Sequence, residues 1–104
     1  MQEEFLGKLS AICERSDFLV QQMGKPELLA DREAYRKVAK ERAELEEVVQ
    51  TFRQHEEFFR ELNESREILK ESPEHEMQEL AKEEISRLET ELIKLEQQLR
   101  RLMI

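Results

Sequence analysis

The sequence predicts an all-α protein, and its composition, its few helix breakers and its apolar spacing all support this class. The chain has 104 residues, of which only 2 are glycine and 2 are proline. Its abundant Glu, Leu, Lys, Arg and Ala residues are strong helix formers, and it lacks the alternating β-branched residues typical of strands. We expect a single domain over residues 1–104. It should be a three-helix bundle whose long antiparallel helical hairpin extends into a two-helix coiled-coil tip.

The first helix is predicted over about residues 2–23. Its apolar stripe has spacings of four and three, a helical pattern, and consists of Phe5, Leu9, Ile12, Ser16, Leu19 and Met23. Three residues one position further on widen the stripe, namely Leu6, Cys13 and Val20. A face of this width suits a helix that packs against two others. Gly24 is expected to cap the helix, and Pro26 to begin a short turn of its own.

The second helix is predicted over about residues 32–70, with Asp31 as its N-cap. At 1.5 Å per residue this helix is roughly 60 Å long. Its expected inward stripe consists of Val38, Leu45, Val48, Phe52, His55, Phe59, Leu62, Arg66 and Leu69.

The third helix is predicted over residues 73–103, with Ser72 as its N-cap and Pro73 in its first position. Its heptad seam consists of Ala81, Ile85, Leu88, Leu92, Leu95, Leu99 and Leu102. The short link before it makes the second and third helices antiparallel neighbours. The first helix is about half as long as the second, so residues 53–80 should form a bare two-helix tip.

The chain is acidic, with a net charge of -8. No long segment is basic overall, so the whole domain should repel nucleic acid, and contact with RNA would need a local patch. Cys13 is the only cysteine, which suits a reducing cytoplasm. The acidic start differs from a signal peptide, and the apolar runs are too short to span a membrane.

No group of residues predicts catalysis, so we expect neither an enzyme nor a cofactor or metal site. His55 begins a sequence similar to the zinc-protease motif HExxH, but Phe59 occupies the second ligand position. His55 is interpreted as a packed residue of the core stripe. The acidic pairs are interpreted as solvated helix faces; they are Glu46-Glu47, Glu56-Glu57 and Glu83-Glu84.

A basic cluster is the first candidate for a functional surface. Four of its residues lie in the opening turns of the second helix, and antiparallel packing is expected to bring the end of the third helix to them. The cluster consists of Arg32, Arg36, Lys37, Lys40, Arg100 and Arg101. One interpretation is a set of solvated side chains that balance an acidic domain. The other is a docking face for RNA phosphate or an acidic partner.

The adjacent aromatic residues Phe58 and Phe59 form the second candidate, because both cannot point into a two-helix seam. Phe59 fits the predicted stripe, and Phe58 should lie beside it in the bare tip. The Phe58 ring would then either lie along the flank of the seam or act as an exposed anchor for a partner protein.

The opening of the second helix also carries a family resemblance. Its distinctive residues are Asp31, Tyr35, Arg36, Lys37, Ala39, Lys40, Glu41, Ala43, Leu45, Val48 and Val49. This pattern resembles the signature helix in the N-terminal domain of bacterial class I peptide chain release factors, and it is closer to the type that reads UAA and UAG. Ser72-Pro73-Glu74 followed by Met77 resembles the family's Asp-Pro-Glu-Met step. Lys25-Pro26-Glu27 resembles its Asp-Pro-Glu, with Lys25 in place of the usual Asp.

The resemblance implies the N-terminal domain of a translation termination factor. The family's stop-codon tripeptide and Gly-Gly-Gln loop are absent from this sequence, so the chain is expected to be non-catalytic on its own. The implied partners are the ribosome, in its factor-binding region near the L11 stalk, and the GTPase release factor. No membrane is implied, and the isolated domain is expected to be monomeric. The alternative is a free-standing coiled-coil adaptor that dimerises through the third helix.

Overall fold

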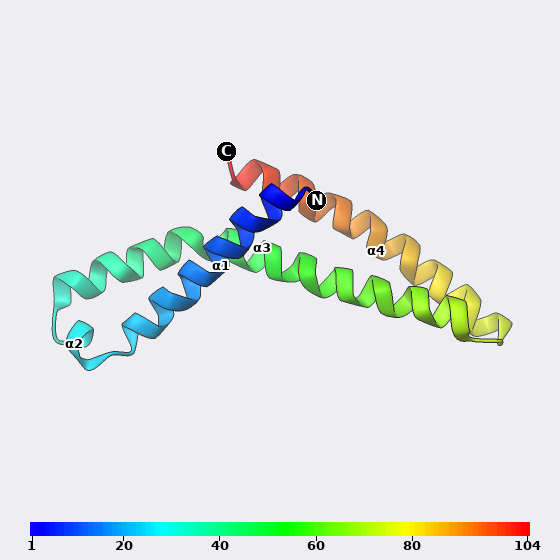
Figure 1. Ribbon diagram of the computed structural model, residues 1–104, viewed down its shortest axis with the longest axis horizontal. Helices are drawn as coiled ribbons and strands as arrows, with labels where there is room; N and C mark the ends of the chain where they lie inside the picture. Colours follow the sequence, from blue (N-terminus) through cyan, green and yellow to red (C-terminus); the bar gives the residue numbers. More distant parts are fainter. The chain divides into compact units, whose positions relative to one another are not determined.

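The computed structural model describes residues 1–104 and is helical except at its ends and short connections (Figure 1). Its helices are α1 (Glu3–Met23), α2 (Pro26–Leu29), α3 (Arg32–Glu71) and α4 (His75–Leu102). The all-α class and the long helical hairpin are therefore confirmed. The chain forms two compact units, Met1–Gln50 and Thr51–Ile104, and α3 contributes to both. The packing of three long helices into one bundle remains a prediction.

The first unit, Met1–Gln50, has the predicted helix ends. The backbone N–H of Gly24 donates to the carbonyl oxygen of Gln21 at 3.2 Å and closes α1. Pro26 begins the short helix α2, because a proline in the first turn loses no helical hydrogen bond. The backbone N–H of Ala34 donates to Asp31 Oδ1 at 3.1 Å, so Asp31 is the N-cap of α3.

The apolar stripe of α1 is confirmed along its centre. Leu9 is 0% exposed and Leu19 is 2% exposed, and Ser16 is buried between them. The predicted widening is wrong at Val20, whose side chain is 48% exposed. The buried face of α1 is therefore narrower near its C-terminal end than the sequence pattern indicates.

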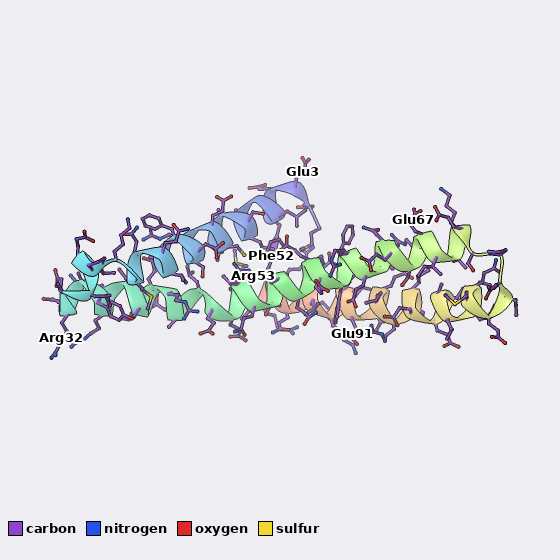
Figure 2. The ribbon with its side chains drawn as sticks, turned by 90° about the horizontal axis from the view of Figure 1, so that it is seen from below. Glu3, Arg32, Phe52, Arg53, Glu67 and Glu91 are labelled. Atoms are coloured by element: carbon purple, nitrogen blue, oxygen red, sulfur yellow. The ribbon has the colours of Figure 1, made fainter.

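The second unit, Thr51–Ile104, is an antiparallel hairpin made of the second half of α3 and the whole of α4. Both views show these segments side by side (Figures 1 and 2). Leu62 of α3 packs with Leu88 and Leu92 of α4, and Phe58 and Ile85 pack against this group. The predicted α4 seam is confirmed, since its buried residues are Ala81, Leu88, Leu92 and Leu99.

The expected inward stripe of α3 is wrong at two positions in this hairpin. Phe59 is 51% exposed, and the exposed Arg66 guanidinium lies 3.7 Å from Glu89 of α4. The inward row instead consists of Thr51, His55, Phe58, Leu62, Ser65 and Leu69, all buried or half-buried. A two-helix seam takes two positions in seven with a 3.5-residue period. The expected and the observed rows both have this period and share His55, Leu62 and Leu69. They differ at the alternate positions, where the structure buries Phe58 and the small Ser65 and leaves the charged Arg66 outside, because an unpaired buried charge is costly.

The start of α4 also differs from its prediction. Pro73 and Glu74 precede α4, and Glu74 is its N-cap with an extended backbone and no capping bond from its side chain. Ser72 therefore does not cap α4. Its carbonyl oxygen accepts a hydrogen bond from Gln78 Nε2 at 2.9 Å, which ties the link to the first turns of α4.

Candidate functional site

The structure positions four predicted cations on the opening turns of α3. The Asp31 cap fixes where this helix begins. Arg32, Arg36 and Lys40 then follow at intervals of four residues, which places them along one side of the helix. Lys37 lies next to this row. All four side chains are exposed, and Figure 2 shows Arg32 at the outer end of α3. We call these four residues the α3 basic row.

The charge around the α3 basic row is positive although the chain is acidic. Residues 32–42 contain five basic and two acidic residues, a net charge of +3, whereas the whole chain carries -8. No residue of the row forms an ion pair. On the hairpin, by contrast, Arg60, Lys82 and Arg87 each pair with a glutamate of their own helix. The row is therefore available to an external anion.

Arg15 of α1 pairs with one of the two acidic residues of segment 32–42, which leaves that segment more positive. Its Nε and Nη2 atoms donate to the Glu41 carboxylate at 2.6 and 2.8 Å. The hydrogen bond from Arg15 lowers the pKa of Glu41. The ionised Glu41 carboxylate is therefore paired with Arg15 of α1. Its negative charge offsets the α3 basic row less than its position in the sequence indicates.

The α3 basic row belongs to the first unit, whereas Arg100 and Arg101 belong to the second. They belong to the last turn of α4 in the second unit, and both are exposed. Gln98 Nε2, close to them, donates to Thr51 Oγ1 at 3.4 Å, so the end of α4 lies beside that part of α3. The gathering of all six cations on one face therefore remains a prediction.

The aromatic pair has the opposite arrangement to the one expected. Phe58 is half-buried against the Leu62, Leu88 and Leu92 group, and the Arg87 guanidinium carbon lies 5.7 Å from the centroid of its ring. Phe59 is the exposed ring. Sequence reasoning missed this because it followed the heptad that contains Phe59, which also puts Arg66 in the seam. The cost of burying the Arg66 guanidinium was the signal for the alternative heptad, which contains Phe58 and Ser65.

His55 is a packed residue, as predicted. It is 8% exposed, and its ring stacks on Phe52 with centroids 6.5 Å apart. Its Nε2 atom lies 3.8 Å from Glu96 Oε1 of α4. Burial lowers the pKa of His55, and the negative charges of Glu96 and Glu56 oppose this only in part. No group of three or more His, Cys, Asp or Glu residues could hold a metal ion.

The lowered pKa of His55 predicts a loss of stability in mild acid. A histidine with a folded-state pKa below its unfolded value of about 6.5 favours the folded state above that pH, and this contribution falls as pH drops toward the folded pKa. The urea midpoint of the wild type should therefore fall between pH 7.5 and 5.5. The His55→Gln variant should show a smaller fall, because its side chain does not titrate. Equal falls for both proteins would contradict this assignment.

Comparison of the chain with known proteins identifies its family. Residues 12–104 match the model of the PCRF domain family. The chain is similar to peptide chain release factor 1 of Lactobacillus gasseri, with 31% identity over 102 residues that cover 98% of this chain and 28% of the relative. It is similar to peptide chain release factor 1 of an Exiguobacterium species, with 39% identity over 98 residues that cover 93% of this chain and 28% of the relative.

These matches confirm the resemblance that the second predicted helix carries. The chain spans 28% of the length of the curated relatives it matches. No solved structure matches it. No helix has the length and the apolar character needed to cross a membrane.

Proposed function

The chain belongs to the PCRF domain family, and on that premise we propose that it is the N-terminal domain of a translation termination factor of the UAA- and UAG-reading type. The observation that carries this proposal is similarity to proteins named peptide chain release factor 1 over 98% of the chain. The domain would act in the cytoplasm on the ribosome, in the factor-binding region near the L11 stalk. It would also communicate with the GTPase release factor.

The α3 basic row is the proposed contact with the ribosome. Its exposed cations form no ion pair, so an RNA phosphate could bind them without first displacing a carboxylate. The acidic remainder of the chain opposes general affinity for nucleic acid. Contacts to phosphate position a protein without reading a sequence, and such positioning is the role proposed for this domain.

The domain is proposed to be non-catalytic, with hydrolysis performed by another part of the complete factor. Its adjacent acidic residues support this. Arg60 and Arg87 donate hydrogen bonds that lower the pKa values of Glu57 and Glu84. A general acid that works near neutral pH needs a raised pKa instead. These carboxylates are therefore suited to ion pairs on a helix surface.

A domain-replacement experiment tests this function. The matching segment of the Exiguobacterium release factor would be replaced by this chain, and peptide release would be measured on ribosomes programmed with a stop codon. We expect the chimera to release peptide faster than a variant that lacks the segment, because the domain positions the factor. The isolated chain should release none. A chimera no faster than the deletion would refute the domain assignment, and release by the isolated chain would refute the non-catalytic role.

A further inference from the structure

The closed end of the hairpin carries exposed apolar side chains that its core does not use. Ile68 of α3 is 41% exposed, and Met77 and Leu80 of α4 are 40% and 60% exposed. They lie on either side of the short link between the two helices. We call these three residues the tip patch.

The seam register places the tip patch on one flank of the hairpin. The half-buried Gln78 continues the α4 seam one step before Ala81. Ile68, Met77 and Leu80 each come directly before a seam residue, namely Leu69, Gln78 and Ala81. In an antiparallel pair of helices, residues that precede seam positions on the two helices share one flank, and residues that follow them share the other. Arg66 and Glu89 directly follow the seam residues Ser65 and Leu88, and they form an ion pair. This pair shows that residues following seam positions share a flank. The three apolar residues therefore form one surface contributed by both helices.

Acidic side chains surround the tip patch. Residues 61–84 contain nine acidic and three basic residues, a net charge of -6 out of -8 for the whole chain. Figure 2 shows Glu67 on the outer surface of this end of α3. Glu76 and Glu83 lie one turn before and after Leu80 on α4. An apolar surface with such a rim favours an apolar partner segment that carries positive charge around it.

We propose that the tip patch binds a basic amphipathic helix of a partner protein. Apolar side chains at helical spacing would cover Ile68, Met77 and Leu80, and flanking lysines or arginines would meet the glutamates. Nucleic acid and anionic lipid surfaces carry the wrong charge for this end of the hairpin. A second copy of the chain would bring another acidic tip against the first. This inference does not depend on the proposed role in termination, because it rests on the hairpin alone.

A designed peptide tests the tip patch on the intact chain. The probe is a fluorescent helix-forming peptide of leucine and lysine, with leucines at spacings of three and four. Its binding would be followed by fluorescence anisotropy. Changing Ile68 and Leu80 together to Gln should weaken binding by about tenfold, because apolar anchors contribute most of the affinity of such contacts. The matched control is Ile93→Gln. Ile93 is 56% exposed on α4 but lies outside the patch, so its change should have little effect.

The charge requirement is tested separately. Changing Glu76 and Glu83 to Gln should slow association, and added salt should reduce the difference from the wild type. Helical circular dichroism would verify that each variant folds. Three results would overturn the proposal: no binding of the probe, equal binding of a scrambled peptide with the same composition, or a dimer in sedimentation that the patch variants disperse.

Discussion

Replacing Leu88 with alanine is expected to destabilise the protein by about 2–5 kcal/mol, the usual cost of truncating a buried leucine. Leu88 is 0% exposed and packs with Leu62 and Leu92, with Phe58 and Ile85 against them. Truncation would lose these contacts and leave a cavity that two helices held by a short link cannot readily close. A loss of this size is a large part of the stability of a small domain.

Leu80 is the matched control for this prediction. It lies on the same helix but is 60% exposed, so Leu80→Ala should change the free energy of unfolding by less than about 0.5 kcal/mol. Urea unfolding followed by circular dichroism would measure both variants. Equal losses for the two would mean that the hairpin core is not where the structure places it.

The same seam shows how far the sequence determined the fold. In α4 almost every seam position is leucine, isoleucine or alanine at heptad spacing, so only one register buries them, and its prediction was correct. In α3 both Phe58 and Phe59 are apolar, and Ser65 is polar, so hydrophobicity alone allows two registers. Charge decides between them, because one register would bury the Arg66 guanidinium in the seam. The other register buries the small Ser65 side chain and leaves Arg66 outside, where it pairs with Glu89 of α4.

The candidate site was also predictable only in part. A sequence of closely spaced cations after an N-cap predicts an exposed row, and Arg36 and Lys40 are exposed as expected. The partner of Glu41 was not predictable, because Arg15 lies 26 residues away in the sequence. The gathering of these residues with Arg101 remains a prediction, because Arg101 belongs to the second unit and the α3 basic row to the first.

Charge reversal of the α3 basic row is expected to slow termination by the chimeric factor about three- to tenfold, since removing complementary charge mainly slows association. The variant would carry Arg36→Glu and Lys40→Glu. Both side chains are exposed and neither forms an ion pair, so helical content should be unchanged. Lys8→Glu is the matched control, because Lys8 is an exposed lysine on α1 with no ion pair. Its reversal changes the net charge by -2, half of the change in the double variant, without changing the row.

An exposed aromatic contact is the competing explanation, and Phe59→Ala tests it. Phe58 is unsuitable for this comparison because its ring packs on the hairpin core. Termination rates would be measured at two salt concentrations for all three variants. A contact through the α3 basic row predicts that reversal slows the rate at low salt and that the difference shrinks at high salt. A contact through Phe59 predicts a loss that salt hardly alters, because apolar burial is not screened. If Lys8→Glu slows termination as much per reversed charge as the double variant does, net charge and not the row controls the rate, and the proposed contact is wrong.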